Sequence, residues 1–576
     1  MAPPPDASDP REISAGELLL LALDAHGIDF FFCNPGTDFP PIIEAFARAQ
    51  KTEAPAPRPL VVPHENTAVT MAHGVYLVSG KPQAVMVHVS VGTGNTLNAL
   101  IDAARDHIPI LLLAGRTPIT EGGAQGLHGA RSLHIHWAQE MFDQASLVRE
   151  FVKWEYELRT PEQAADAVGR AMELMLASPR GPAYLTLPRE VLGGPVRASA
   201  PPKPRGVPAA PRPDPAAIDE LAGMIERAER PLVIAGASGK TAAAVTGLAT
   251  LAERYALPVV AMNPRYMCLP WSHPMHQGFQ PAPLVADADL VIVAENDVPW
   301  IPSRERPPAD CPVAHLGADP SFARYPMRSY RNDLAIAADL PATFGALDAA
   351  LGSLVSPEDA KIAARRNRFA TRAREIRRSW SEASAKAGKA EAIAPEWLSR
   401  CLGEALPADA IVFNEYPLQL EHCVRDLPGS YFGLSPAGGL GWSTGAALGG
   451  KLAAGDRLVV ATVGDGAYVF ANPTACHWTA AKYGLPILTV IFNNQRYGAV
   501  RRATLAMYGQ GAAAEEDGRL LSDLSPSPAY EKVIEASGGH GERVERPAEL
   551  PAAIERAIRA VTREKRDALL NVICRY

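Results

Sequence analysis

Arg457-Leu458-Val459-Val460-Ala461-Thr462-Val463-Gly464-Asp465-Gly466 is the stretch that decides the predicted fold of this chain. Its apolar first part predicts a buried β-strand, and the glycines on both sides of Asp465 end that strand sharply. Residues 471–484 then have the composition of a helix, with Asn472 as the expected cap and Pro473 in the first position.

A second apolar run at residues 486–492 predicts another strand, which stops at Asn493-Asn494. The stretch 457–494 is therefore predicted to be one βαβ unit with polar residues where each strand ends. Open parallel sheets bind ligands at the carboxyl ends of their strands, so Asp465 and Asn494 become candidates for a binding site.

A divalent cation that holds a diphosphate is the ligand that suits these residues. A hard cation such as Mg²⁺ takes a few oxygen ligands from protein and the rest from phosphate and water. Asp465 offers a carboxylate and Asn494 an amide carbonyl, while Gly466 lets the backbone approach a phosphate closely. The alternative is a structural turn at each strand end, with no ligand.

The composition is that of an ordinary globular protein with several domains. The chain has 576 residues, of which 47% are hydrophobic and 21% charged, and its net charge is −7. This length predicts about two to four domains. The mild acidity gives no reason to expect nucleic acid or an anionic membrane as a partner, and no apolar run is long enough to span a bilayer.

The seven cysteines are scattered, odd in number and free of any C-x-x-C pair. This usage predicts reduced thiols and a cytoplasmic protein rather than a disulfide framework or a zinc site. The start of the chain, Met1-Ala2-Pro3-Pro4-Pro5, lacks the basic end and the apolar core of a signal peptide.

Residues 1–197 alternate short apolar strands with helical stretches, which is the pattern of an α/β domain with a parallel sheet. The strand at 29–33 runs into Asn34-Pro35-Gly36-Thr37-Asp38, a turn expected to cap the next helix. Glu65 follows the strand at 59–62, and His88 ends the strand at 84–88. We expect Thr37, Glu65 and His88 to share one rim of the sheet.

A segment rich in proline and small residues, 198–215, predicts a stiff linker and a domain boundary. Residues 216–355 form a second predicted α/β domain, and a charged helical connector at 357–391 leads to a third, at 390–576. In the second domain, Gly236-Ala237-Ser238-Gly239-Lys240 partly matches a nucleotide loop but lacks the phosphate-loop spacing.

Gly-Asp-Gly and Asn-Asn, separated by the 26 residues 467–492, resemble the cofactor motif of the thiamine diphosphate (ThDP) enzymes. Two further blocks match this family in the same order along the chain: His64-Glu65-Asn66 and Ala437-Gly438-Gly439-Leu440-Gly441. The chain is thus similar to ThDP enzymes of the acetolactate synthase, pyruvate oxidase and decarboxylase type.

This resemblance implies three consecutive parallel-sheet α/β domains. Residues 1–197 would bind the pyrimidine of the cofactor, residues 216–355 would be structural or bind a second nucleotide, and residues 390–576 would bind the diphosphate and Mg²⁺. In this family the first domain of one chain faces the third domain of its partner. A homodimer with two shared sites is therefore implied, with a homotetramer as a dimer of such dimers.

The resemblance also implies the cofactor contacts. Glu65 would bond the aminopyrimidine ring and so activate the cofactor. The backbone carbonyl of Gly438 would accept from the 4′-amino group, and Leu440 would hold the two rings in a folded shape. The diphosphate and metal contacts fall on Asp465, Gly466, Ala467, Asn494 and the backbone of Arg496. The metal ligands in this set are Asp465, Asn494 and Arg496.

Within the family, the motifs are most similar to those of the benzoylformate decarboxylases. His88 matches a block that carries an active-site histidine there, and Thr37 takes the place of a serine that helps to hold the substrate carboxylate. An imidazole at His88 suits proton transfer to the carbon left after CO₂ is lost. The alternative is a histidine with a purely structural role at a strand end.

Several positions depart from the benzoylformate decarboxylase pattern. Residues 294–301 hold no counterpart of the second catalytic histidine, so His128, and less directly His276, are the candidates to replace it. Residues 414–417 stand where hydroxyl side chains touch the diphosphate, so those contacts must differ. The small side chains of Ala499, Val500 and Ala503 predict a roomier or reshaped substrate pocket. Its other expected border residues are Thr37, His88, Leu127 and His128.

The predicted function is the ThDP- and Mg²⁺-dependent decarboxylation of a 2-oxo acid to an aldehyde, with carboligase (acyloin-forming) capacity when an aldehyde is the second substrate. The expected catalytic residues are Glu65, Thr37, His88 and His128. Three alternatives stay open: an acetolactate synthase-like carboligase, an FAD-dependent oxidase of the same fold, and a ThDP-binding protein without catalysis. The complete set of Glu65, Asp465 and Asn494 argues against the last.

Overall fold

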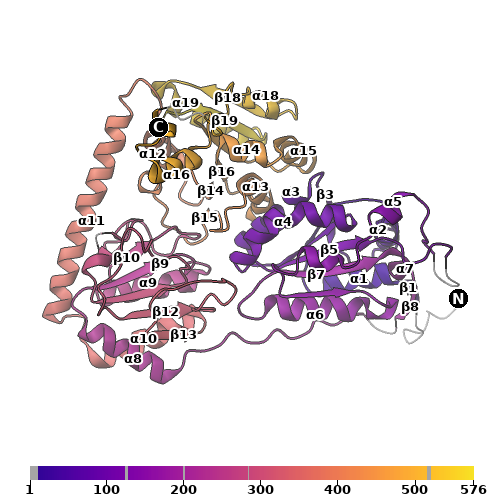
Figure 1. The fold of residues 1–576 in the computed structure, drawn as a ribbon, viewed down its shortest axis with the longest axis horizontal. Helices are drawn as coiled ribbons and strands as arrows, with labels where there is room; N and C mark the ends of the chain where they lie inside the picture. Colours follow the sequence, from indigo (N-terminus) through magenta and orange to yellow (C-terminus); the bar gives the residue numbers. More distant parts are fainter. Residues whose placement is uncertain (1–10, 124–127, 199–200, 283, 516–519, 576) are drawn as a thin grey trace. The chain divides into compact units, whose positions relative to one another are not determined.

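Three parallel β-sheets follow one another along the chain and form three α/β domains (Figure 1). The computed structural model describes residues 11–123, 128–198, 201–282, 284–515 and 520–575. The predicted fold class is confirmed, whereas the exact domain limits at 197, 216, 355 and 390 stay a prediction. Across the described residues, no helix combines the length and the apolar character that a membrane span requires.

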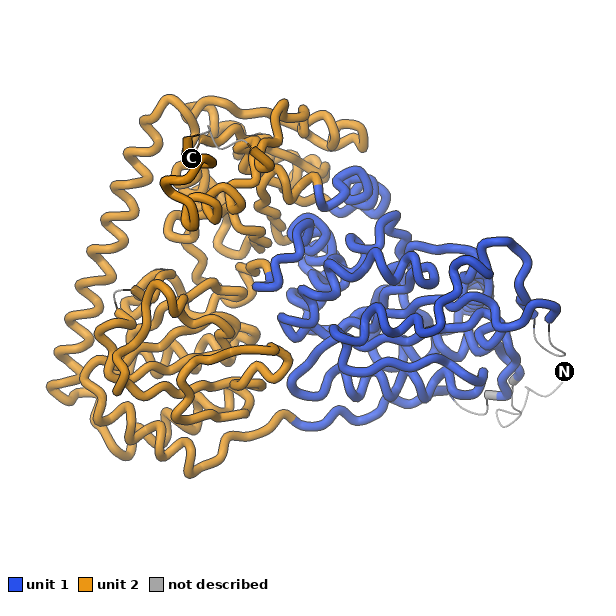
Figure 2. Tube along the Cα trace, viewed as in Figure 1, with its two compact units in different colours: residues 1–209, 435–455, 470–485 blue, residues 210–434, 456–469, 486–576 orange. Residues whose placement is uncertain are grey.

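The residues group into two compact units, which are coloured separately in Figure 2. Unit 1 comprises residues 1–209, 435–455 and 470–485, and unit 2 comprises residues 210–434, 456–469 and 486–576. Helices α13 (Trp442–Ala454) and α15 (Pro473–Tyr483) therefore belong to unit 1, although they lie between strands of the third sheet in sequence.

The large sheet of unit 1 has the strand order β3-β2-β4-β5-β7-β6, and all its neighbouring strands are parallel. Its strands are β2 (Phe30–Asn34), β3 (Arg58–Val61), β4 (Gln83–Val87), β5 (Ile110–Arg116), β6 (Trp154–Glu157) and β7 (Ala183–Pro188). A short antiparallel pair joins β1 (Arg11–Ser14) to β8 (Pro195–Ala198). Because β2 lies between β3 and β4, the loops that leave these three strands meet at one edge.

The helices that connect these strands are α1 (Ala15–Ala25), α2 (Pro40–Thr52), α3 (Glu65–Ser79), α4 (Val89–Arg105), α5 (Ile135–Ala138), α6 (Ala164–Leu176) and α7 (Arg189–Leu192). Helix α3 packs closely against α13. A Cβ atom on Gly74 would collide with the carbonyl of Ala446, and a Cβ atom on Gly449 would collide with the carbonyl of Met71. Only glycine lets the two backbones come this close.

The second sheet, in unit 2, has the parallel order β10-β9-β11-β12-β13. Its strands are β9 (Pro231–Ala235), β10 (Val259–Ala261), β11 (Leu290–Ala294), β12 (Val313–Gly317) and β13 (Leu334–Ala337). The helices are α8 (Pro215–Arg227), α9 (Ala242–Arg254), α10 (Leu340–Leu354) and the long connector α11 (Ala360–Ala387). The connector confirms the helix predicted at 357–391.

The third sheet, also in unit 2, has the parallel order β15-β14-β16-β17-β19-β18. Its strands are β14 (Ile411–Glu415), β15 (Tyr431–Gly433), β16 (Val459–Gly464), β17 (Leu488–Asn493), β18 (His540–Val544) and β19 (Ala568–Ile573). The remaining helices are α12 (Pro395–Ala405), α14 (Asp465–Phe470), α16 (Gly498–Met507), α17 (Ala512–Glu515), α18 (Tyr530–Glu535) and α19 (Leu550–Thr562).

The opening stretch of the sequence forms β16 and β17, which are parallel neighbours as the βαβ prediction required. Two details of the prediction are wrong. The prediction places one helix, at residues 471–484, between the two strands. The structure has two helices there, since α14 starts at Asp465 directly after β16 and precedes α15. Asn472 stands before α15 with a φ of 54° and makes no capping hydrogen bond through its side chain. Asparagine tolerates this left-handed conformation, which joins the two helices.

Candidate active site

Glu65 begins α3, separated from the end of β3 by three residues, and two asparagines hold its carboxylate. Asn34 Nδ2 donates to Oε1 at 2.9 Å, and Asn95 Nδ2 donates to Oε2 at 2.5 Å. Asn34 ends β2 and Asn95 lies on α4, so three elements converge on one carboxylate. Charge-assisted hydrogen bonds of this kind fix the orientation of the acid. Sequence reasoning missed both asparagines as partners of Glu65.

His88 lies between β4 and α4 and forms a short hydrogen bond with Asp38. Nδ1 of His88 is 2.5 Å from Oδ1 of Asp38, and the backbone N–H of Val89 donates to Oδ2 at 3.3 Å. The hydrogen bond with Asp38, which is only 3% exposed, raises the pKa of His88. A Cβ atom on Gly36 would collide with the imidazole, so the loop before Asp38 can pass the ring only because it carries glycine there.

The turn at residues 34–38 does not cap the next helix, which corrects a prediction. The residue before α2 is Phe39, which has no side-chain capping bond, and Pro40 occupies the first position of the helix. The carboxylate of Asp38 is unavailable for capping because His88 and the backbone of Val89 use its two oxygens.

Thr37 and His136 form the opposite side of this site. Nδ1 of His136 accepts from the backbone N–H groups of Ser132 and Leu133 at 3.1 and 3.4 Å, so its proton lies on Nε2. Nε2 is 3.5 Å from Oγ1 of Thr37. Burial lowers the pKa of His136, and the ring is therefore a neutral N–H donor beside a hydroxyl group.

Gln139 and Arg189 complete the surroundings of the two histidines. Nε2 of Gln139 lies 3.2 Å from Nε2 of His88. The guanidinium of Arg189 donates to the carbonyl of Thr37 at 3.0 Å and to the carbonyls of Gly129 and Ala130 at 2.5 Å. One narrow crevice, which has no room for a water molecule, lies between these side chains; Thr37, Asp38, His88, His136, Gln139 and Arg189 are among those that line it.

Sequence reasoning proposed His128, not His136, as the second histidine. His128 is exposed, one residue before the Gly129 carbonyl that Arg189 holds. His136 does not lie in any recognised sequence motif. It is brought next to Thr37 by the fold, 99 residues along the chain. Leu127, a predicted pocket residue, lies outside the described residues.

The predicted glycine turn before α13 lies against α4 within unit 1. Asn98 Nδ2 donates to the carbonyl of Leu440 at 2.9 Å, and the backbone N–H of Gly439 donates to Oδ1 of Asp102 at 3.0 Å. Gly438 has a φ of 72°, a left-handed conformation that glycine adopts readily. Helix α4 starts directly after His88, so one helix supports the turn at one point and the histidine at another.

Asp465, in unit 2, is a buried carboxylate with an unpaired oxygen. Its side chain is 2% exposed, and Oδ2 has no hydrogen-bond partner. Burial raises the pKa of Asp465 to about 6. A cation beside Oδ2 would remove this electrostatic penalty, so the residue fits a Mg²⁺ ligand.

Asn494 and Gly466 also fit a metal-bound diphosphate. Asn494 Oδ1 accepts from the backbone N–H of Arg496 at 3.1 Å, which fixes the orientation of the amide oxygen and leaves a second lone pair. A Cβ atom on Gly466 would lie 2.5 Å from the ring of Tyr497. No cluster of three or more His, Cys, Asp or Glu side chains suited to a metal occurs in the described part of the chain. A Mg²⁺ ion commonly takes several of its ligands from phosphate and water.

The other predicted contacts are placed as follows. Ala467 is in the first turn of α14, and Ala499, Val500 and Ala503 are exposed on α16. Asn414 is committed to internal hydrogen bonds, because Oδ1 accepts from Thr462 at 2.9 Å and from the backbone of Leu418 at 3.2 Å. The expectation that diphosphate contacts here differ from those of the benzoylformate decarboxylases stays a prediction.

The partial nucleotide loop of the second domain is filled by the chain itself. A Cβ atom on Gly239 would collide with the carbonyl of Met267, and Nζ of Lys240 forms an ion pair with Glu295 at 2.9 Å. The charge of Lys240, which would attract a phosphate, is thus offset by Glu295 of the same domain.

Comparisons with known proteins match all three domains. The models of the thiamine pyrophosphate enzyme N-terminal TPP binding domain, central domain and C-terminal TPP binding domain match residues 13–147, 218–347 and 418–572. Benzoylformate decarboxylase from Pseudomonas aeruginosa is 28% identical over 497 residues, covering 83% of this chain and 85% of that protein.

Two further similarities extend over almost the whole chain. A probable acetolactate synthase from Mycobacterium bovis is 26% identical over 569 residues, which are 96% of this chain and 95% of that protein. The structure of a thiamine diphosphate-dependent 4-hydroxybenzoylformate decarboxylase from Rhodococcus jostii has a TM-score of 0.76 and 23% identity, covering 98% of this chain and 99% of that one.

Proposed function

We propose that this chain, which belongs to the thiamine pyrophosphate enzyme family, catalyses the non-oxidative decarboxylation of a 2-oxo acid to an aldehyde. The observation that carries the proposal is the Asp38–His88 pair, which faces Thr37 and His136 at the same sheet edge as Glu65. An imidazole with a raised pKa and two neutral donors suit a substrate that carries a carboxylate and later needs a proton.

The cofactor of this activity would be ThDP with Mg²⁺. The unpaired oxygen of Asp465, the oriented amide of Asn494 and the backbone of Arg496 would hold the metal ion. Gly466 and Ala467 would border the diphosphate, and Gly438 and Leu440 the ring system. When bound, ThDP supplies the electron sink that carbon–carbon cleavage requires.

Glu65 would exchange a proton with the pyrimidine side of the cofactor. Asn34 and Asn95 donate to its two oxygens, so both residues position the carboxylate. A fixed orientation matters because proton transfer requires hydrogen-bond contact between the acid and its partner.

His88 would act as the acid that delivers a proton to the reacting carbon. Asp38 favours the imidazolium form, because its hydrogen bond raises the pKa of His88. The hydroxyl of Thr37 and the Nε2–H of neutral His136 would bind the substrate carboxylate. Neutral donors bind a carboxylate less tightly than a guanidinium does, which suits a group that must leave as uncharged CO₂.

The substrate pocket would also include Leu127, Ala499, Val500 and Ala503, and His128 would be a further candidate at its border. We propose a homodimer with shared sites, or a dimer of dimers, as the active assembly. The cytoplasm is the proposed compartment, because all seven cysteines are free and buried.

An acetolactate synthase-like carboligase is the second candidate. The near-complete coverage of the probable acetolactate synthase from Mycobacterium bovis favours it. The two activities differ in the last step, since protonation releases an aldehyde whereas a second carbonyl compound would form a carbon–carbon bond. The raised pKa of His88 favours the first outcome.

Product analysis tests the proposal. The purified enzyme with ThDP and Mg²⁺ is supplied with benzoylformate, 4-hydroxybenzoylformate, pyruvate and longer aliphatic 2-oxo acids, and CO₂, aldehydes and hydroxyketones are quantified. We expect aldehyde and CO₂ in equal amounts. An acetohydroxy acid or another 2-hydroxyketone as the main product from every substrate contradicts the decarboxylase and supports the carboligase.

The variant His88→Ala tests the assigned acid. We expect slower aldehyde release, by roughly 10²-fold or more, with ThDP affinity unchanged. Unchanged turnover would show that the histidine has a purely structural role. A colourless preparation of the wild-type protein would in addition argue against the FAD-dependent oxidase.

A further inference from the structure

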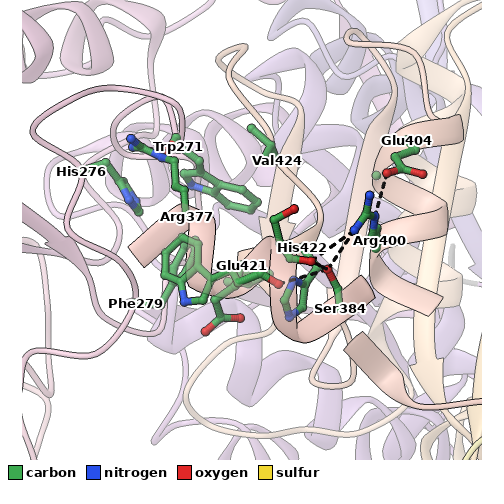
Figure 3. Close-up of a pocket in the computed structure, with 14 residues that line it drawn as sticks. Trp271, His276, Phe279, Arg377, Ser384, Arg400, Glu404, Glu421, His422 and Val424 are labelled. Carbon is green, nitrogen blue, oxygen red and sulfur yellow. Dashed lines mark hydrogen bonds and ion pairs between the residues drawn. The ribbon is translucent and has the colours of Figure 1, made fainter. Parts of the chain in front are cut away.

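A cavity of about 290 Å³ in unit 2 is lined by none of the residues assigned to the proposed reaction (Figure 3). Its walls come from three parts of the chain: the loop after β10, the connector α11, and the region of α12 and the short 3-10 helix Leu420–His422. This volume is close to that of sites that take small organic ligands.

One end of the cavity is a wall of aromatic rings. Phe279 packs edge-on to Trp271 with ring centres 5.2 Å apart and stacks on Trp380 with ring centres 6.2 Å apart. Figure 3 shows Trp271, Phe279 and His276 grouped at this end, whereas Arg400 and Glu404 lie at the other. Such a wall favours a flat, apolar ring as its ligand.

Two buried N–H groups at the aromatic end have no hydrogen-bond partner. The Nδ1 atom of His276 accepts from the backbone N–H of Gly278 at 3.3 Å, so the ring proton lies on Nε2. Nε2 of His276 and Nε1 of Trp271 have no hydrogen-bond partner among the described residues, although these side chains are only 1% and 3% exposed. Buried donors are costly to leave unpaired, so a ligand acceptor that reached these two groups from the cavity would be bound favourably.

The charge at this end is positive. Nη2 of Arg377 donates to the carbonyls of Trp271 and His273 at 2.9 and 2.7 Å, which fixes the guanidinium beside the aromatic wall. No ion pair joins Arg377 to a carboxylate among the described residues. Arg400, by contrast, is paired with Glu404 at 2.8 Å.

Burial lowers the pKa of Arg377 and the nearby carboxylate of Asp426 opposes that shift, and the titratable groups that line the cavity do not cancel the charge fully. Burial raises the pKa of Glu421 and lowers the pKa of His422, which shifts both towards their neutral forms. Burial also keeps His276 neutral, with its pKa lowered to about 3. Arg377 is thus the charged group that an incoming ligand would meet first at the aromatic end.

We propose that this cavity is a binding site for a small aromatic carboxylate, whose ring lies on the Trp271–Phe279–Trp380 wall and whose carboxylate accepts from Trp271 and His276 next to Arg377. The site is independent of the proposed reaction. It joins the loop after β10 to α11 and to the Leu420–His422 turn, so an occupant would stabilise the junction of the second and third domains.

Equilibrium dialysis and thermal unfolding of the full-length holoenzyme test this site, with benzoate, benzamide and benzylamine as probes. The three share a ring and differ in carrying a negative, neutral or positive group. We expect benzoate to bind, to raise the unfolding temperature and to quench tryptophan fluorescence. Benzamide should bind at least roughly tenfold more weakly, because hydrogen bonds to a charged acceptor are the stronger ones.

Trp271→Phe keeps the aromatic wall and removes one unpaired N–H, and Arg377→Gln removes the charge. Each should weaken benzoate binding by roughly tenfold or more. Arg378→Gln is the matched control, since this neighbour on α11 is 75% exposed and faces Glu382 at 3.8 Å. We expect it to bind benzoate like the wild type. Circular dichroism checks that each variant is folded, and if Arg377→Gln does not fold, the test rests on Trp271→Phe.

Three results would overturn the proposal. Benzylamine could bind as well as benzoate, which would make the site selective for the ring or for a cation. Benzoate affinity could be unchanged in both cavity variants. It could also be lost in Thr37→Val and His88→Ala while both cavity variants bind normally, which would place benzoate at the proposed active site.

Discussion

Asp38 Oδ1 lies 2.5 Å from Nδ1 of His88, across a sheet edge to which the two residues come from different strand ends. The aspartate is buried, and its second oxygen accepts a hydrogen bond from the backbone N–H of Val89. Its first oxygen orients the imidazole of His88 and raises the pKa of that ring. This pair gives the site an acid whose strength depends on one carboxylate.

Asp38→Asn is expected to move the alkaline limb of the pH profile of kcat to lower pH. Asp38 raises the pKa of His88, so the active imidazolium persists to higher pH in the wild type and is lost as the pH rises through that pKa. Without the charge of Asp38, the imidazolium is lost at lower pH. If the pKa falls by one unit, kcat on the alkaline side falls about tenfold.

The matched control for this variant is Asp29→Asn, because Asp29 pairs with Lys81 at 3.0 Å on the surface of the same domain. It should leave the profile unchanged. A kcat that falls equally at every pH in Asp38→Asn would mean that the carboxylate only holds the loop.

Metal binding is expected to weaken as the pH falls through about 6. Burial raises the pKa of Asp465 to about 6, and only the ionised carboxylate binds Mg²⁺ well. Below that pH the apparent affinity for Mg²⁺ should fall about tenfold per pH unit, because a proton competes for the same oxygen. Titration of the ThDP-loaded protein with Mg²⁺ at pH 5, 6, 7 and 8 measures this, and a constant affinity would remove Asp465 from the metal site.

Asp465→Asn is expected to abolish Mg²⁺ binding and yet to stabilise the protein without cofactor. The folded-state pKa is raised from 3.8 to about 6, so the ionised form opposes folding above pH 6, and this penalty disappears as the pH falls below the unfolded value. Removing the charge should raise the free energy of unfolding by up to about 3 kcal/mol at pH 8. Urea unfolding at pH 8 and pH 5 tests this, and an equal effect at both would contradict it.

Mixed dimers test whether active sites are shared between subunits. Glu65→Gln and Asp465→Asn should each be inactive when expressed alone. If each site takes Glu65 from one chain and Asp465 from the other, a dimer of the two variants contains one intact site, and co-expression should restore up to about half the activity per dimer. If each chain supplies both residues of a site, the mixture stays inactive, which would contradict the shared-site dimer.

Gly449→Ala is expected to destabilise unit 1. Its Cβ atom would meet the carbonyl of Met71 where α13 packs on α3, and neither helix backbone can yield freely. Overpacking of this kind costs roughly 1–3 kcal/mol or more. Gly345→Ala on α10 is the control, since no atom lies within 4 Å of its added Cβ, and it should stabilise the protein by roughly 0.5–1 kcal/mol. Chemical denaturation of both variants measures the difference.

The helices and strands that position the site were largely predictable, because they follow from local patterns. The apolar runs before Gly464 and Asn493 became β16 and β17, and Glu65 and His88 stand at the ends of β3 and β4 as expected. Errors arose where a side chain had a distant partner. The turn at residues 34–38 is predicted to cap a helix from its neighbours in sequence alone, and the prediction names His128 but not His136, because no local signal marks the latter.

The sequence by itself determined the three α/β domains and the candidate cofactor residues, since hydrophobic periodicity and short motifs act over a few turns of chain. The tertiary structure decided which groups meet. Asp38 and His88 are 50 residues apart, Thr37 and His136 are 99 apart, and Asn98 and Leu440 are 342 apart. Strand order and helix packing create these contacts, and hydrogen bonds formed across such distances leave no periodic trace in the sequence.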